Sequence, residues 1–144
     1  MMEETSAEAV EKVELSEGSE HIIKMLNSGE GGQMIFEPAV IKVSVGDTIH
    51  FKATDAAHNS VSVDGMVPVG ASSWASQLSQ DISITLDTEG VYVYQCDPHL
   101  IMAMVGVIQV GEAVNMDEIK SAASSYSSNF LMNNDRLQSY LSQL

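Results

Sequence analysis

Short apolar runs follow one another from residue 21 to residue 110, and each is closed by Gly, Pro, Asp, Asn or Ser. Runs this short, separated by turn-forming residues, are typical of β-strands rather than of helices. Several runs also alternate in polarity, so that Ile49 and Phe51 share one face of an expected strand while His50 lies on the other. The pattern therefore predicts an all-β body in which His50 faces solvent rather than a binding site.

The expected strands can be read from these runs. They cover 22–26, 34–36, 40–45, 48–53, 58–63, 82–86, 91–95 and 105–110, and a long surface connection covers 64–79. Seven or eight short strands, roughly, is the number found in Greek-key sandwiches. We therefore expect an all-β, Greek-key β-sandwich of about eight strands.

The C-terminal part of the chain has a different pattern, which predicts two helices. Asn115 is a suitable N-cap residue and Glu118 stands at the capping-box position, so a first helix is expected at about 115–125. A second helix is expected at about 134–143, where helical spacing places four apolar side chains on one face: Leu137, Tyr140, Leu141 and Leu144. Both helices should pack on the sandwich and belong to one domain, residues 21–144.

Charge limits the kinds of partner that this chain can have. Its 144 residues include 20 acidic and 6 basic side chains, a formal net charge of −14. Such a charge excludes nucleic acid and anionic membranes as natural partners, because phosphate groups would be repelled. No apolar stretch approaches the roughly 20 residues that a membrane-spanning helix needs, so we expect a soluble protein without a membrane span.

Residues 1–20 form an acidic leader that holds seven Glu and one Lys. It has neither a basic start nor an apolar core, so it is not a signal peptide, and the chain is expected to be a mature form. Because the leader has few apolar residues to bury, it is expected to be mostly disordered, with a short frayed helix as the alternative.

Cys96 is the only cysteine of the chain, which excludes an intramolecular disulfide and a dinuclear centre bridged by two thiolates. It begins a Cys-x-x-His motif with His99, while Met104 follows and His58 precedes the motif. Together these residues offer one thiolate, two imidazoles and one thioether, which is the donor set of a type 1 copper site. Zinc is disfavoured, because a thioether is a poor zinc ligand and no second Cys or His pair has suitable spacing. We therefore expect one bound copper ion.

The spacing also indicates how a scaffold of strands could hold these donors. Cys96 ends one expected strand and Met104 opens the next, so a single hairpin presents three of the four donors. His58, at the start of a neighbouring expected strand, supplies the fourth. Met102 is the competing sulfur, and Asp97 is expected to be a surface polar residue.

Longer stretches around these donors carry a family resemblance. They are His58-Asn59, the strand 91–96 leading into Cys-x-Pro-His, the run Met-x-Met-Val-Gly-Val at 102–107, and segments 25–27, 34–38, 45–48 and 65–68. Together with the two terminal helices, they resemble the cupredoxin family and, within it, the pseudoazurins. The resemblance implies a periplasmic type 1 (blue) copper protein that carries single electrons between redox proteins. A copper nitrite reductase or a cytochrome is the kind of partner that it implies.

The resemblance also implies the roles of individual residues. The four copper ligands would be His58, Cys96, His99 and Met104. Asn59 would tie the two ligand loops together and donate its backbone N–H to the Cys96 sulfur, whereas Pro98 has no N–H to offer. Met34 would pack near the His99 ring, with ordinary core packing as the alternative.

Two features depart from that family. Its members commonly carry lysines around the copper edge, whereas this chain is strongly acidic, so the acceptor is left open. The ligand loop is also bulkier than usual. It predicts an apolar docking patch formed by Met66, Val67, Pro68, Leu100 and Ile101.

A copper-binding chaperone or buffer in the periplasm is the alternative function, because Met102 and Met104 also suit the capture of Cu(I). A cysteine hydrolase is disfavoured, since no glycine-rich nucleophile turn surrounds Cys96. We therefore expect an electron carrier that is not an enzyme, that is a monomer, and that exchanges electrons through the edge of His99.

Overall fold

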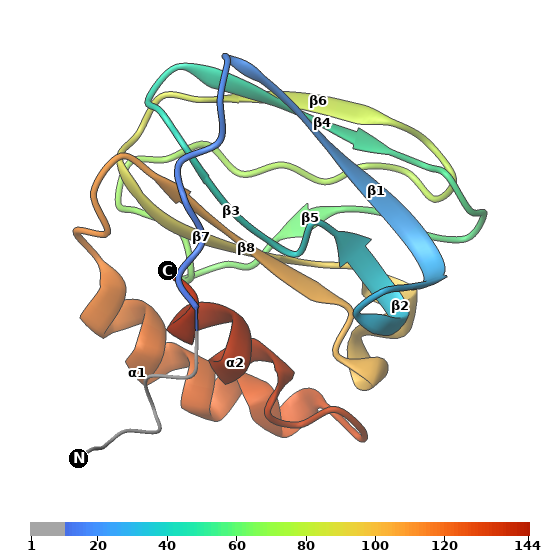
Figure 1. Cartoon of the computed structure of the whole chain (residues 1–144). Coiled ribbons are helices and arrows are strands. Elements are labelled where there is room, and N and C mark those ends of the chain that lie inside the picture. The colour runs from blue at the N-terminus through green and yellow to red at the C-terminus, as the bar shows by residue number, and fades with distance from the viewer. Residues whose placement is uncertain (1–10) are drawn as a thin grey trace.

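Two four-stranded β-sheets pack face to face in the computed structural model, which describes residues 11–144 (Figure 1). The strand order is β2-β1-β4-β6 in the first sheet and β3-β8-β7-β5 in the second. The strands are β1 (Glu20–Gly29), β2 (Gly32–Glu37), β3 (Val40–Val43), β4 (Asp47–Lys52), β5 (Val61–Ser62), β6 (Ile82–Leu86), β7 (Gly90–Gln95) and β8 (Val105–Val110). β1 pairs with β4 and β3 with β8 in parallel, and the other pairs are antiparallel. The predicted all-β sandwich is confirmed.

β7 is buried on both faces and contributes to two hydrophobic cores. Tyr92, Tyr94 and Cys96 belong to the core between the two sheets. Val91 and Val93 belong to a second core, on the outer side of the second sheet. The division follows from the two-residue period of a strand, in which successive side chains point to opposite faces. Cys96 directly follows the strand and continues its inward series, so the thiol has no solvent exposure.

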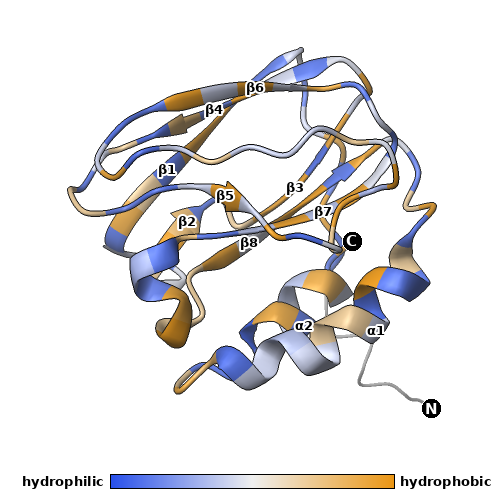
Figure 2. Cartoon of the chain, turned by 180° about the vertical axis from the view of Figure 1, so that it is seen from behind, coloured by the Kyte–Doolittle hydropathy of each residue, from blue (hydrophilic) through white to orange (hydrophobic). Residues whose placement is uncertain are grey.

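Two helices cover the outer face of the second sheet (Figures 1 and 2). They are α1 (Met116–Tyr126) and α2 (Arg136–Ser142), close to the predicted ranges. Their buried side chains are Ile119, Ala123, Leu137 and Leu141, and these pack against the outward valines of β7 and β8. No helix within residues 11–144 has the length and apolar character needed to cross a membrane.

The predicted cap of α1 is wrong in its chemistry. Asn115 stands at the N-cap position, but its side chain makes no capping hydrogen bond. Its amide oxygen instead accepts from the Val91 N–H at 2.7 Å, and its amide nitrogen donates to the Val91 carbonyl at 3.0 Å. A tertiary contact has replaced the local cap, and it ties the start of α1 to the start of β7.

β5 is shorter than the predicted strand 58–63, because only Val61 and Ser62 pair with β7. The residues before them, which include His58, lie on a loop. That loop is held by the long connection after β5: the Ser79 N–H donates to the His58 carbonyl at 2.8 Å, and the Trp74 indole donates to the Ser60 hydroxyl at 2.9 Å. His58 is therefore positioned by a braced loop rather than by a strand ladder.

The predicted acidic leader, residues 1–20, lies partly outside the described residues. From residue 11 onward the structure places backbone contacts between this segment and the domain. Leu15 forms an isolated parallel bridge with Lys42, and the Val13 N–H donates to the Gln143 carbonyl at 2.8 Å. Glu20 already belongs to β1.

A buried, hydrogen-bonded His–Asp pair joins β1 to the start of β4. His21 Nε2 lies 2.8 Å from Asp47 Oδ2, the Ser44 N–H donates to the same oxygen at 3.0 Å, and both His21 and Asp47 are 6% exposed. Burial acts to raise the pKa of Asp47, but the hydrogen bonds from His21 and Ser44 and the His21 charge outweigh it, so the pKa lies below its usual range. The other histidine of the sheet, His50, contacts Ser83 and Glu20 on the partly exposed outer face, away from the ligands.

Replacing Asp47 with Asn should destabilise the copper-free protein by roughly 1 to 3 kcal/mol at pH 7, because a buried charged hydrogen-bond partner is lost. A carboxyl whose folded-state pKa is depressed adds stability above its unfolded pKa of about 3.9, and that stability is lost as the pH falls through the folded-state value. The gap between wild type and Asp47→Asn should therefore narrow as the pH falls below about 4. Urea unfolding across this range measures it, with the exposed Asp64→Asn as control; a gap independent of pH would contradict the assignment.

Candidate metal centre

The loop between β7 and β8 carries three of the predicted ligands. Asp97–Met102 form a short 3-10 helix, and Ala103 ends it in the left-handed conformation with φ 59°. Two backbone hydrogen bonds close the loop at its base: the Cys96 N–H donates to the Met104 carbonyl at 2.9 Å, and the Met104 N–H donates to the His99 carbonyl at 3.2 Å. Cys96, His99 and Met104 are thus held at the same end of the sandwich.

The structure brings His58 into this group from its own loop. The Cys96 sulfur lies 3.7 Å from His58 Nδ1 and 3.4 Å from His99 Nδ1, and the three donor atoms all lie within 4.8 Å of one another. Met104 has no solvent exposure and belongs to the same core as Cys96. His58 is fully buried, whereas His99 is only half-buried.

These separations fit a shared metal ion. Bonds of about 2.3 Å to sulfur and about 2.0 Å to nitrogen, at the open angles of a four-coordinate site, end about 3.4 to 3.7 Å apart. The donors are one soft thiolate, two imidazoles and a buried thioether, which together suit copper in both of its common oxidation states. The residues present therefore fit a copper ion.

Asn27 fixes the ring of His58, a contact that the sequence pattern did not predict. The Asn27 amide oxygen lies 2.8 Å from His58 Nε2, so this nitrogen donates and Nδ1 is left free to face the Cys96 sulfur. Burial lowers the pKa of His58, and the nearby His99 lowers it further, while Asp55 acts in the opposite direction. The neutral imidazole that a metal needs is therefore favoured.

A metal needs Cys96 as the charged thiolate, which the buried environment disfavours. Burial raises its pKa, the backbone N–H groups of Asn59 and His99 act to lower it, and the charge of Asp97 acts to raise it. The Asn59 contact is the one that the resemblance implied. The His99 contact was not expected, because the prediction considered only the missing N–H of Pro98. Since the balance still favours the protonated thiol, the thiolate depends on a bound cation.

Asp97 links the two ligand loops, so the prediction that it is merely a surface polar residue missed this role. Its N–H donates to the Asn59 amide oxygen at 2.8 Å, and its carboxylate accepts from the Asn59 amide at 3.3 Å. The same carboxylate accepts from Gln95 at 2.9 Å, and Gln95 in turn accepts from the Tyr126 hydroxyl of α1. The resemblance implied that Asn59 ties the two ligand loops together, but it did not name Asp97 as the partner, which lies 38 residues further along the chain.

The other predicted neighbours of the site lie near it. Met34 is partly buried and packs against the core that holds Cys96 and Met104. Its predicted contact with the His99 ring stays a prediction. Pro98 is exposed and opens the 3-10 helix of the ligand loop, where a residue without an N–H costs no hydrogen bond.

The prediction that Met66, Val67 and Pro68 belong to an exposed docking patch is wrong. Met66 and Pro68 are buried, and Val67 is partly buried. The Met66 carbonyl accepts from the Val93 N–H midway along β7, and Pro68 packs against Gly90 at the start of that strand. Met66 and Pro68 therefore lie along β7 away from the end that carries the ligands; Met66 belongs to the second core, and Val67 packs against the core between the sheets.

Two residues that the sequence pattern missed take their place beside the ligand loop. The Leu131 and Met132 N–H groups both donate to the Ile101 carbonyl, at 2.7 and 3.3 Å. The side chains of Ile101, Leu131 and Met132 are 52%, 76% and 49% exposed. In Figure 2 the ligand-loop helix ends in hydrophobic colour near the connection between the two α-helices. The exposed apolar surface at this end is thus formed by Ile101, Leu131 and Met132, with Leu100 half-buried behind them.

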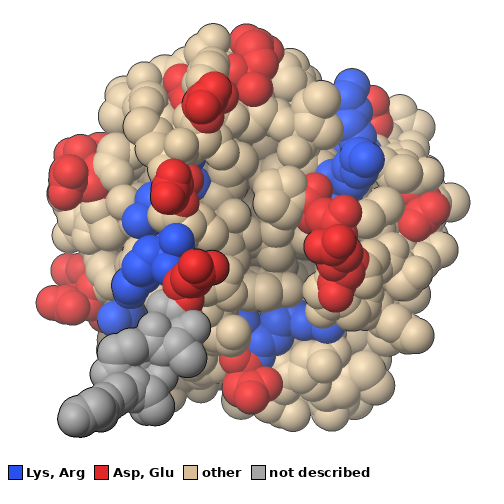
Figure 3. Space-filling model, viewed as in Figure 1, with Lys and Arg blue, Asp and Glu red and all other residues tan. Residues whose placement is uncertain are grey.

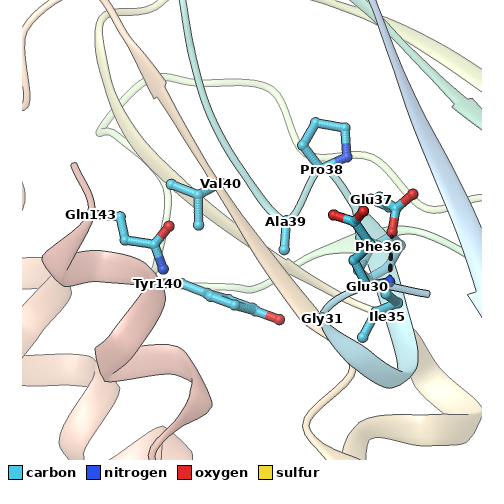
Figure 4. A pocket seen from close by; sticks show the side chains of 10 residues that line it. All are labelled: Glu30, Gly31, Ile35, Phe36, Glu37, Pro38, Ala39, Val40, Tyr140 and Gln143. Carbon is cyan, nitrogen blue, oxygen red and sulfur yellow. Dashed lines mark hydrogen bonds between the residues drawn. The ribbon is translucent and has the colours of Figure 1, made fainter. Parts of the chain in front are cut away.

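A groove of about 600 Å³ lies between β2 and α2, and none of the four predicted ligands lines it. Glu30 and Glu37 stand on one side, where the Glu30 N–H donates to the Glu37 carboxylate at 3.3 Å, and Tyr140 and Gln143 stand on the other (Figure 4). The ligand cluster therefore does not share this groove.

Comparison with known proteins identifies the family. Residues 23–111 match the copper binding proteins of the plastocyanin/azurin family. The pseudoazurin of Paracoccus pantotrophus is 41% identical over 103 residues, which cover 71% of this chain and 71% of that protein. The crystal structure of pseudoazurin from Methylobacterium extorquens AM1 superposes with a TM-score of 0.69 at 42% identity, covering 71% of this chain and 84% of that one. Pseudoazurin from Hyphomicrobium denitrificans gives a TM-score of 0.67 at 41% identity, covering 70% and 82%.

The chain therefore belongs to the copper-binding plastocyanin/azurin family and, within it, to the pseudoazurins. This agrees with the resemblance that its motifs indicated. Copper is accordingly the metal for which His58, Cys96, His99 and Met104 are arranged.

Replacing Asn27 with Ala should weaken copper binding by about 10- to 100-fold, the usual cost of removing a residue that orients a metal-binding histidine. The Asn27→Asp variant keeps an oxygen at the same place and should retain most of the affinity. Competition with a copper chelator measures the effect. Equal affinity of wild type and Asn27→Ala would show that the His58 ring is held by packing alone.

Proposed function

We propose that this protein carries single electrons between larger redox proteins and that it is not an enzyme. The observation that supports this most directly is the unequal burial of the four donors: three are fully buried, and the fourth, His99, is only half-buried. Cys96, His58 and Met104 have no solvent exposure, whereas His99 lies between the exposed Pro98 and Ile101. None of these four donor residues lines the groove between β2 and α2, and electron transfer needs no substrate cavity.

The proposed ligands are His58, Cys96, His99 and Met104, binding one type 1 copper ion. Copper would supply a one-electron couple, with an intense blue Cu(II)–thiolate chromophore in the oxidised form. The residues of this chain supply rigidity: the hydrogen bonds at the base of the ligand loop and the contact of Asn27 with His58 hold the donors in nearly fixed positions. Such fixed donors keep the structural cost of each electron transfer small.

The edge of His99 is the proposed point of electron exchange. It is the one proposed ligand that reaches the surface. The side chain of Ile101 is exposed on the same loop, and those of Leu131 and Met132, whose backbone N–H groups donate to the Ile101 carbonyl, are exposed as well. An apolar surface around a conducting residue permits close, short-lived docking, because little polar surface has to lose its water.

Copper delivery, the alternative function, is less well supported. A chaperone must open its site so that a recipient can take the metal, but three of the four donors are fully buried. The Asn59–Asp97 pair also ties the two ligand loops together, which opposes opening.

The proposed partners are a donor and an acceptor redox protein, with a cytochrome or a copper nitrite reductase as candidates. Acidic side chains are spread over the face drawn in Figure 3, with basic ones among them in a few groups. Because the net charge is −14, a partner with a basic docking face is favoured. We place the protein in the periplasm, since cytosolic thiols would compete for copper bound by a thiolate.

The first test is the colour of the copper-loaded protein. Wild type should be intensely blue when oxidised, and Cys96→Ser should lose the colour while remaining folded, because the thiolate makes the chromophore and the strands make the fold. Visible absorption and circular dichroism measure both properties. A Cys96→Ser variant that stays blue would refute the ligand assignment.

The second test concerns the charge of the partner. The screening length falls from about 30 Å to about 10 Å as ionic strength rises from 0.01 to 0.1 M, so electron transfer with a basic cytochrome should slow markedly. Transfer with an acidic copper nitrite reductase should instead become faster, because repulsion is relieved. Stopped-flow kinetics with both proteins, and with a small uncharged reductant as control, decides between the two. Slower transfer to the acidic protein at higher salt would overturn the proposed docking charge.

A further inference from the structure

Arg136, the first residue of α2, reaches back to the ligand loop. Its Nη1 donates to the carbonyl oxygens of Met102 at 3.4 Å and of Ala103 at 3.2 Å, which are the two residues directly before Met104. The first turn of a helix is an unfavourable place for a cation, because the helix dipole is positive there. The hydrogen bonds from Arg136 to the loop therefore offset the unfavourable interaction of its charge with the helix dipole.

The same guanidinium also binds the start of β2. Nη1 donates to the Met34 carbonyl at 3.1 Å and Nη2 to the Gln33 carbonyl at 3.3 Å. A Cβ on Gly32 would lie 3.2 Å from Nη2, so the glycine leaves room for the side chain. One arginine thus joins three separate segments: β2, the ligand loop and α2.

Two of these carbonyls belong to residues in an unusual conformation. Met34 has φ 53° and Ala103 has φ 59°, in the left-handed region that residues other than glycine rarely adopt. Such conformations persist only where the surroundings hold them. The carbonyl groups of both residues accept hydrogen bonds from Arg136, which is a direct physical means of holding them.

We propose that Arg136 is a positioning residue of the metal centre: its guanidinium fixes the Met102–Ala103 backbone, and thereby the position of the Met104 thioether. The inference rests on the proposed function, in which Met104 would be one of the four copper ligands. The task requires arginine, because a fixed fork of several N–H donors can bind separated carbonyl groups at once. Nη1 reaches the carbonyls of Met34, Met102 and Ala103 while Nη2 reaches that of Gln33. Lysine carries the same charge on a single nitrogen, which can contact some of these carbonyl groups but cannot also take the place of Nη2 in a fixed plane. Asn133 assists, since its side-chain amide donates to the Met102 carbonyl at 3.2 Å.

The test compares Arg136→Gln and Arg136→Lys with wild type. In the copper-free protein, hydrogen exchange at the Ala103 and Met104 amides should be about tenfold faster or more in Arg136→Gln, because charge-assisted hydrogen bonds that hold the loop are lost. Exchange at Val93 in β7 should not change, which separates local loosening from global destabilisation. In the copper-loaded protein, the visible and EPR spectra should shift in the same direction as in Met104→Leu, and Arg136→Lys should restore only part of the wild-type spectrum.

Lys120→Gln is the matched control, because it removes the same charge from the exposed surface of α1 and should change neither exchange nor spectrum. If Arg136→Gln does not fold, Asn133→Gly takes its place: glycine tolerates the φ of 56° at that position, and the loss of one amide should give the same changes to a smaller degree. Unchanged loop exchange would overturn the proposal, and full rescue by Arg136→Lys would overturn the role assigned to the second guanidinium nitrogen. A wild-type protein that is not blue would instead refute the proposed function, and the copper-free exchange data would still decide on Arg136.

Discussion

β7 is buried on both faces, and this burial fixes the positions of both hydrophobic cores and of the loop that follows the strand. Its inward residues Tyr92 and Tyr94 build the core between the sheets, and its outward valines build the core under the helices. A strand held from both sides can shift neither along nor across the sheet without moving buried side chains. Cys96 follows this strand directly, so the position of the thiol is set by the two cores before any metal binds.

The remaining donors are held by hydrogen bonds between loops. Asn27 orients His58, the Asn59–Asp97 pair joins the two ligand loops, and Arg136 holds the backbone before Met104. In the absence of metal, burial keeps the thiol protonated and His58 neutral, so the cluster carries no uncompensated buried charge. Binding of copper then releases the thiol proton, which couples the affinity to pH.

The strand pattern and the three donors of one loop, Cys96, His99 and Met104, could be predicted from residues close together in the chain. His58, which lies 38 residues before Cys96, was added because its imidazole completes the donor set and because the family resemblance implies it. The alternation after Gly90 marks β7, and the Cys-x-x-His motif with a following Met marks the metal. Features that depend on distant segments were missed or wrong: Asn115 binds Val91 instead of capping its helix, and Pro68 packs at the start of β7 instead of beside the ligands. The local sequence around a residue does not indicate against which end of a distant strand that residue will pack in the folded protein.

The folded chain, and not the metal, should therefore set the geometry of the donor cluster. Crystal structures of the copper-free and copper-loaded protein test it most directly, by the positions of Cys96 Sγ and of Nδ1 in His58 and His99. These atoms should shift by no more than about 0.5 Å between the two structures, the tolerance of a preorganised site. A copper-free structure in which the ligand loop is displaced or unresolved, so that the three atoms separate, would contradict it.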